Sequence, residues 1–169
     1  MQTDEVDARF ETIDSAEDPR LGDYVGLTDP DIRRLFADRP FFIAEGVEVV
    51  RRLVASDVEV RSIVVAPNRL EAMREVVSTV TCPVYVAERS VVSRIVGFDL
   101  HRGVIASAWR PPSVSFAEVV ARAPRRGHVH RLAILHGISD HENIGAIVRS
   151  ARAFSYDALV LDPTCADPY

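Results

Sequence analysis

Short apolar runs alternate with helix-forming segments along most of the chain, and this alternation restricts the possible folds more than any other feature of the sequence. Runs rich in β-branched and aromatic residues predict four strands, at 41–44, 61–66, 83–87 and 103–108. Apolar residues three and four positions apart predict helices between them, at 47–54, 68–77 and 89–96. Strands that alternate with helices are typical of layered domains. We therefore expect an α/β fold in which helices cover a sheet in an α/β/α arrangement.

The segment from His136 to Arg149 lies between two further apolar runs, 132–135 and 158–161, and predicts the turn and helix of a strand–helix–strand unit. Asn143 and Arg149 are six residues apart, so they would not share a face if both lay in mid-helix. If Asn143 lies at the start of the helix, its amide and the Arg149 guanidinium can converge there. The free N–H groups of a helix N-terminus favour an anionic or hydroxyl-bearing ligand.

Two segments divide the chain. Two consecutive prolines within 110–113 stop both kinds of element, so the first domain is expected to end near Trp109. The sequence is therefore divided into an acidic arm, a first domain, a linker with a short helix at 115–121, and the start of a second domain. These segments are 1–18, 19–109, 110–131 and 132–169.

The first segment is expected to be loosely held, because it is acidic and has few large apolar residues. Pro30, next to a capping residue, predicts a short helix that ends near Ala37. Asn68 can cap the helix that follows the second strand.

Charge is unevenly distributed along the chain. The formal net charge is −5, yet residues 1–18 hold seven acidic residues and one arginine, so the remainder carries +1. The net charge of −5 argues against a general polyanion binder, but the acidic end masks a nearly neutral remainder of the chain. The chain has arginine but no lysine, which suits bidentate contacts with phosphates and stacking on bases. Codon usage in a G+C-rich genome explains the absence of lysine at least as well.

Several function classes have no support in the sequence. There is no apolar run long enough to cross a bilayer and no secretory leader, and the two cysteines, Cys82 and Cys165, are expected to be reduced thiols in a cytoplasm. A phosphate-binding glycine loop, a Ser/His/Asp set and a CxxC pair are all missing. His136 and His141 lack a third ligand at fitting spacing, so they give weak support for a metal or a general base.

The run Asn-Ile-Gly-Ala-Ile-Val-Arg at 143–149, followed by Ser-Ala-Arg-Ala-Phe and Leu-Val-Leu-Asp-Pro, resembles the first motif of the SpoU (TrmH-like) RNA ribose methyltransferases of the SPOUT class. Segments 42–46 and 101–106 resemble the beginning and end of the substrate-binding domain of these enzymes, which has the fold of kink-turn-binding ribosomal proteins. The resemblance spans about residues 20–169. The second and third family motifs, which form the knotted cofactor site, are absent, so we expect a fragment of a longer protein without a cofactor site of its own.

This resemblance implies a fold, a reaction and a set of residues. The fold would be a substrate-binding domain followed by the first strand–helix–strand of a trefoil-knot SPOUT domain. The complete protein would be a cytoplasmic homodimer that transfers a methyl group from S-adenosylmethionine to a ribose 2′-hydroxyl of structured ribosomal or transfer RNA. Asn143 and Arg149 would be catalytic. Because arginine has a pKa above about 12, Arg149 is expected to orient the hydroxyl and stabilise the developing oxyanion rather than act as a base.

The resemblance also implies RNA-facing residues, Glu45, Gly46, His101 and Arg102, although a turn glycine and solvated charges explain them equally simply. The linker holds a basic cluster that could contact phosphates, with Arg125 and Arg126 as the RNA-binding candidates. A flexible linker that contacts nothing explains the cluster nearly as well. Two other functions stay open: a non-catalytic RNA-binding module and a protein–protein adaptor. DNA and membranes are not expected as partners.

Overall fold

The computed structural model describes residues 10–27, 41–98, 100–112, 114–121 and 131–168. The chain divides into two compact units, Met1–Pro111 and Pro112–Tyr169, at the two consecutive prolines. The helix expected to end near Ala37 and most of the basic cluster in the linker lie outside the described residues.

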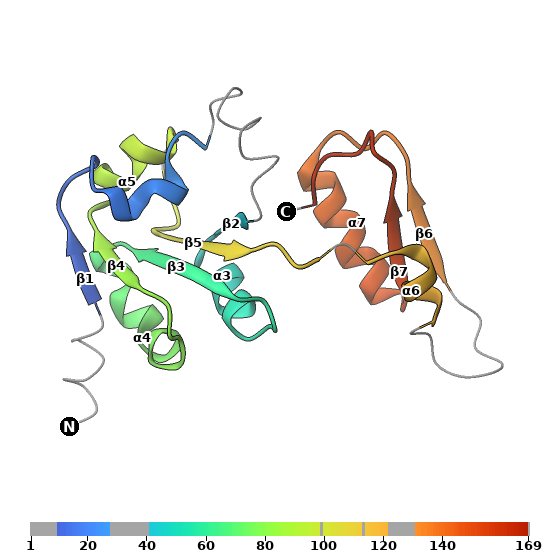
Figure 1. Ribbon diagram of the computed structural model, residues 1–169, viewed down its shortest axis with the longest axis horizontal. Helices are drawn as coiled ribbons and strands as arrows, with labels where there is room; N and C mark the ends of the chain where they lie inside the picture. Colours follow the sequence, from blue (N-terminus) through green and yellow to red (C-terminus); the bar gives the residue numbers. More distant parts are fainter. Residues whose placement is uncertain (1–9, 28–40, 99, 113, 122–130, 169) are drawn as a thin grey trace. The chain divides into compact units, whose positions relative to one another are not determined.

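The first unit is an α/β domain built on one mixed sheet (Figure 1). Its strands are β1 (Phe10–Ile13), β2 (Phe41–Glu45), β3 (Val60–Val65), β4 (Val84–Ala87) and β5 (Val104–Trp109). Its helices are α3 (Val47–Val54), α4 (Leu70–Thr79) and α5 (Arg89–Val96), with the 3₁₀ turns η1 (Pro19–Tyr24) and η2 (Pro67–Arg69). The predicted strands and helices are thus confirmed in type and order, with boundaries that differ by one or two residues.

The five strands lie in the order β1-β4-β3-β5-β2. Strands β1, β4 and β3 run parallel to one another, whereas β5 is antiparallel to both β3 and β2. Consequently β2 and β3 finish at the end of the sheet where β5 begins. This end therefore gathers three loops from distant parts of the sequence.

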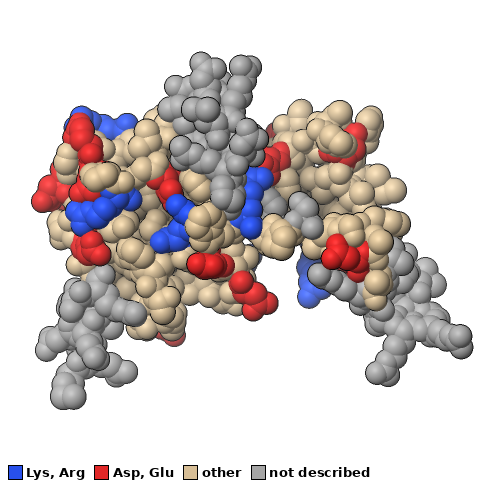
Figure 2. All heavy atoms as spheres, viewed as in Figure 1, with Lys and Arg blue, Asp and Glu red and all other residues tan. Residues whose placement is uncertain are grey.

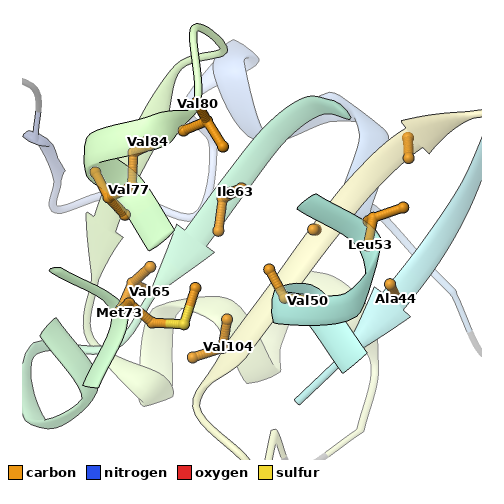
Figure 3. Close-up of a cluster of buried hydrophobic side chains, with 12 residues drawn as sticks. Ala44, Val50, Leu53, Ile63, Val65, Met73, Val77, Val80, Val84 and Val104 are labelled. Carbon is orange, nitrogen blue, oxygen red and sulfur yellow. The ribbon is translucent and has the colours of Figure 1, made fainter. Parts of the chain in front are cut away.

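Helices α3 and α4 cover one face of the sheet, and their apolar spacing produces this packing (Figure 3). Val50 and Leu53 of α3 and Met73 and Val77 of α4 point toward strand residues such as Ile63, and all are buried. On the other face, α5 and η1 bury a second cluster that includes Leu21, Tyr24 and Val92. The sheet therefore has an apolar core on both faces, as the α/β/α arrangement requires.

The prediction of a loose acidic arm is wrong over residues 10–18. Phe10–Ile13 form the edge strand β1, whose register with β4 pairs Phe10 with Val84 and Ile13 with Ala87. Acidic side chains that suggested solvation instead pair with Arg20, which lies 2.8 Å from Glu11 and 2.7 Å from Asp18. A strand of four residues with two exposed polar positions has too weak a pattern to be recognised locally, because its pairing partner lies about seventy residues away.

The cap expected at Asn68 is also wrong. Asn68 lies within the 3₁₀ turn η2, and Arg69 holds the N-cap position of α4 without a side-chain hydrogen bond. The proline at the start of this turn fixes its first φ angle and lacks an N–H, which favours a tight turn before the helix.

A buried polar network joins η1 to the sheet. The Tyr24 hydroxyl donates to the Ser62 carbonyl (2.9 Å), lies 2.7 Å from Ser62 Oγ, and accepts from the Ser107 backbone N–H (3.2 Å). Burial raises the pKa of Tyr24 well above its usual value, so the hydroxyl stays protonated and can donate. Asp23 accepts from Ser107 Oγ at 2.6 Å and from Arg61 Nε at 2.8 Å.

Replacing Tyr24 with phenylalanine is expected to lower the free energy of unfolding by about 1–3 kcal/mol, because the Ser62 and Ser107 groups would lose a buried partner. Urea denaturation followed by circular dichroism measures this change. The matched control is Tyr85→Phe, because Tyr85 is also buried but has no such hydroxyl network in the described structure. Equal stability of Tyr24→Phe and the unchanged protein would contradict the proposed anchoring of η1.

The second unit contains a strand–helix–strand motif. It begins with α6 (Phe116–Ala121), followed by β6 (Leu132–Leu135), α7 (His141–Ala153) and β7 (Ala158–Leu161). Strands β6 and β7 are parallel, with Leu135 opposite Leu161. This confirms the predicted strand–helix–strand motif. Ile144 and Ala151 are the buried residues of α7, and they lie seven positions apart, as expected for one face of a helix.

Candidate functional site

Three of the predicted RNA-facing residues come together at one end of the first unit. Gly46, His101 and Arg102 line a pocket of about 310 Å³, and Arg69 contributes a second guanidinium that sequence reasoning missed. Glu45, the last residue of β2, pairs with Ile105 in the sheet and does not line this pocket. The pocket residues come together because of the sheet topology, in which β2 and β3 end where β5 begins. Arg69 follows β3, a position that could have suggested it.

Two glycines allow the arginines to lie across the backbone in this pocket. Gly46 has a φ angle of +101°, and a Cβ there would lie 2.8 Å from Arg102 Cδ. Gly103 has a φ angle of +67°, and a Cβ there would lie 3.0 Å from Arg69 Cγ. Backbone hydrogen bonds fix both glycines, since Gly46 N–H donates to the Val104 carbonyl and Ala66 N–H donates to the Gly103 carbonyl, each at 2.8 Å. Because neither glycine has a Cβ, the side chains of Arg102 and Arg69 can occupy the space above Gly46 and Gly103.

A larger concavity of about 590 Å³ lies at the opposite end of the sheet, but its two arginines are already paired. Arg61 makes an ion pair with Asp23 and lies 3.9 Å from the centroid of the Trp109 ring. Arg20, the other arginine of this concavity, pairs with acidic side chains of the N-terminal segment. The positive charges of Arg61 and Arg20 are therefore neutralised by contacts within the protein. The smaller pocket is therefore the better candidate for binding an anion.

Positive and negative side chains are interspersed on the face of the first unit that Figure 2 shows. In the smaller pocket, Glu48 accompanies the basic residues, and it is 2.8 Å from Arg51 Nη1. A polyanion bound there would consequently meet a local basic cluster rather than a uniformly basic surface. This agrees with the nearly neutral charge of residues 19–169.

The second unit presents the predicted catalytic residues on α7. The N-cap of this helix is Asp140, whose side chain accepts from the Glu142 N–H at 2.7 Å. Asn143 is the third helical residue, so it lies in the first turn but does not cap the helix. Asn143 and Arg149 are both exposed. Neither side chain makes a hydrogen bond or ion pair with the residues that the structure describes.

Arg149 is directed back along α7. A Cβ added at Gly145 would lie 3.4 Å from Arg149 Nη1, so the guanidinium lies one turn nearer the helix N-terminus than its own Cα. Asn143 and Arg149 are about 120° apart around the helix axis, as six residues of an α-helix require. The structure therefore places both groups near the start of α7 but not in mutual contact. Gly145 leaves the space that this orientation of Arg149 uses.

A polar cluster at the carboxyl ends of β6 and β7 was missed in the sequence. The Asp162 carboxylate accepts from Thr164 Oγ1 at 2.7 Å, from Thr164 N–H at 3.0 Å and from Gly137 N–H at 3.4 Å, and it also contacts His136 Nδ1. The Thr164 hydroxyl first, and then His136 and the Gly137 N–H, hold the pKa of the Asp162 carboxyl below its usual range. The position of these residues in the sequence could have revealed the cluster, because polar residues that directly follow parallel strands meet at one edge of the sheet.

The remaining candidates have less structural support. Arg125 and Arg126 lie outside the described residues. Arg131 is used locally, because its N–H donates to Asp157 at 2.8 Å and its guanidinium donates to the Phe154 carbonyl at 3.3 Å. Among the described residues there is no cluster of three metal-ligating side chains. The described helices also include none with the length and apolarity needed to cross a bilayer.

Comparison with known proteins gives this geometry a context. An uncharacterized tRNA/rRNA methyltransferase of Mycobacterium tuberculosis is 40% identical over 153 residues, which are 90% of this chain and 51% of that protein. No protein-family model matches the chain. The AdoMet-bound rRNA methyltransferase of Sinorhizobium meliloti superposes with a TM-score of 0.71 at 20% identity, over 95% of this chain and 57% of that one. The SpoU methyltransferase AviRb of Streptomyces viridochromogenes gives a TM-score of 0.69 at 22% identity, over 90% and 54%.

The chain is therefore similar in sequence to a mycobacterial tRNA/rRNA methyltransferase and in fold to SpoU methyltransferases. The resemblance carried by the motifs is thereby confirmed, as is an α/β fold with a mixed five-stranded sheet that matches the N-terminal portion of SpoU methyltransferases. The chain spans about half the length of the curated relatives it matches. The roles assigned to Asn143, Arg149 and the pocket residues remain predictions.

Replacing Gly46 with alanine is expected to destabilise the first unit by about 1–3 kcal/mol, because its positive φ angle strains any L side chain. The added Cβ would also push Arg102 out of the pocket. Thermal denaturation measures the loss. Gly22→Ala is the matched control: it has open space and no positive φ angle, so a change below about 0.5 kcal/mol is expected. Equal effects of the two substitutions would contradict this account of Gly46.

Proposed function

We propose that the complete protein is an S-adenosylmethionine-dependent RNA methyltransferase that modifies a ribose 2′-hydroxyl of ribosomal or transfer RNA. In this proposal the first unit binds structured RNA and the second unit contributes the beginning of the catalytic domain. The observation that carries the proposal is 40% identity to the mycobacterial tRNA/rRNA methyltransferase over 90% of this chain, which includes the motif from Asn143 to Arg149.

RNA binding by the first unit rests on the pocket around Gly46. Arg69, His101 and Arg102 converge there from two loops, one after β3 and one before β5, and each guanidinium is well suited to bidentate contact with a phosphate. All three side chains are exposed. Structured RNA displays phosphates and 2′-hydroxyl groups at such a surface, whereas its deep major groove hides the base edges. The pocket therefore suits recognition of the RNA backbone.

Arg149 is proposed to orient the target hydroxyl and to stabilise the negative charge that develops on its oxygen. Its guanidinium lies over Gly145, near the N-terminus of α7, and is not neutralised by an ion pair within the described structure. A fixed positive group beside a developing oxyanion lowers the barrier electrostatically. Asn143, in the first turn, is proposed to add an amide to the same region.

The methyl donor supplies the group that is transferred. Ile134 of β6 is 75% exposed and Phe154 after α7 is 70% exposed, so the described strands and helix leave apolar surface open. Cofactor binding is accordingly assigned to the complete protein, which the resemblance implies to be a cytoplasmic homodimer.

The central test compares three proteins: the gene's complete reading frame, an Arg149→Ala version of it, and this 169-residue chain. Each is incubated with unmodified ribosomal or transfer RNA and methyl-labelled S-adenosylmethionine. Label is expected in RNA with the complete frame only. Arg149→Ala is expected to lower kcat by at least about a hundredfold, because removal of one oxyanion-stabilising group typically costs 10²–10³.

The same experiment distinguishes the other two functions. RNA binding that survives without methylation in any sample would favour a non-catalytic RNA-binding module. Absence of RNA binding even at low salt would favour a protein–protein adaptor, since phosphate contacts are strongest there. Gly22→Ala in the complete frame serves as a control for handling, because it lies in η1, far from both candidate sites in sequence.

Salt dependence tests the pocket. Replacing Arg69 or Arg102 with alanine is expected to weaken RNA binding and to reduce the slope of log Kd against log salt by about one per arginine. Filter binding of transfer RNA at several salt concentrations measures both quantities. Arg94→Ala is a charge-matched control, because Arg94 is 71% exposed on α5 and pairs with Glu17 instead. Equal slopes for all variants would exclude phosphate contacts at the pocket.

A further inference from the structure

Two polar residues that the proposed mechanism does not use lie side by side at the carboxyl edge of the second unit's sheet. His136 and Asp162 directly follow β6 and β7, whose last residues, Leu135 and Leu161, are paired. The Asp162 N–H donates to the Leu135 carbonyl at 3.1 Å and so extends the pairing by one step. Ligands of open parallel sheets bind at this edge. The loop that starts at His136 leads directly into α7.

Asp162 ties the two loops at this edge together. Its carboxylate accepts hydrogen bonds from the Gly137 N–H of the first loop and from both donors of Thr164 in the second. A further backbone hydrogen bond joins the loops, from Ala166 N–H to the Ile138 carbonyl at 2.7 Å. The loop that positions the start of α7 is thereby fastened to the end of β7.

The same carboxylate determines the orientation of the His136 ring. An ionised carboxylate only accepts hydrogen bonds, so Nδ1, the ring atom in contact with Asp162, carries the hydrogen. In the neutral ring the lone pair is then at Nε2. His136 is 82% exposed whereas Asp162 is 24% exposed. Within the described residues Nε2 has no partner.

The exposed lone pair selects the ligand chemistry. The lone pair of Nε2 repels phosphate oxygens, and it can accept a hydrogen bond from a donor group of a ligand. The donor that every RNA nucleotide carries, and DNA lacks, is the 2′-hydroxyl. Arg149, by contrast, suits an anion. The two side chains thus offer complementary contacts to a ribose–phosphate backbone.

We propose that His136 is an RNA-contacting residue whose Nε2 accepts a hydrogen bond from a ribose hydroxyl, and that Asp162 is the positioning residue that holds the ring for this contact. The inference rests on the proposed function, because it assumes that RNA reaches the start of α7. It adds to Asn143 and Arg149 a third group, supplied by the loop rather than by the helix.

The experiment uses the complete reading frame with His136→Asn and His136→Gln. The amide of asparagine occupies roughly the place of Nδ1, and the amide of glutamine reaches roughly the place of Nε2. RNA binding is measured by filter binding without methyl donor, on unmodified ribosomal and transfer RNA transcripts, and kcat and KM are then measured with the donor. His136→Asn is expected to raise Kd by about threefold to tenfold, as loss of one hydrogen bond predicts, whereas His136→Gln stays close to the unchanged protein.

Asp162→Asn tests the positioning role. It is expected to impair RNA binding as His136→Asn does and to speed hydrogen exchange at the amides of Gly137 and Thr164, which His136→Asn leaves protected. Exchange is measured on the 169-residue chain by NMR. Unchanged exchange in Asp162→Asn would overturn the positioning role.

The outcomes separate the inference from the proposed function. A complete frame that methylates RNA while His136→Asn binds and turns over normally would overturn the RNA contact and leave the proposed function intact. Equal impairment of His136→Asn and His136→Gln would also overturn it, because glutamine should restore the Nε2 contact. A complete frame that methylates neither RNA would instead contradict the proposed function itself.

Discussion

The antiparallel pairing of β5 with both β3 and β2 is the constraint on which the first unit depends. Val104, Ala106 and Ala108 face the core under α3 and α4, whereas Ile105 belongs to the core under α5 and Ser107 bonds to η1. One strand therefore contributes to both layers. Because β5 runs against its neighbours, the loop before it returns to the end of the sheet where β2 and β3 finish. The pocket around Gly46 is a direct product of this reversal.

The sequence was sufficient for those elements whose pattern is local. Val50 and Leu53, or Met73 and Val77, repeat at helical spacing and face one core. Strand β1 could not be recognised in this way, because it is four residues long and becomes a strand only through its pairing with β4. The cap of α4 was mistaken for a related reason. A proline-led 3₁₀ turn replaced the expected Asn68 cap, and turn type depends on backbone geometry as well as on residue identity.

The candidate sites show the same division. The motif located Asn143 and Arg149 on one helix, but only the structure shows that Arg149 lies back across Gly145. The resemblance indicated Gly46 and Arg102. Arg69 lies in the same pocket because Gly103 has no Cβ to displace its side chain, and residue spacing in the sequence does not predict this contact. Asp162 and His136 are 26 positions apart, and their contact exists only because β6 and β7 are parallel and in register. The direction of a side chain and the register of distant strands are therefore the features of these sites that the sequence alone did not predict.

Strand β1 also has a consequence for solubility. Without it, β4 would present the apolar sequence Val-Tyr-Val-Ala at an open sheet edge, where unpaired N–H and C=O groups can template pairing with another chain. Strand β1 covers that edge and replaces it with one only four residues long, which carries Glu11 in an ion pair with Arg20. Short, charged edge strands resist edge-to-edge association. Residues 10–13, which the acidic composition assigned to a solvated arm, thus protect the β4 side of the sheet against aggregation.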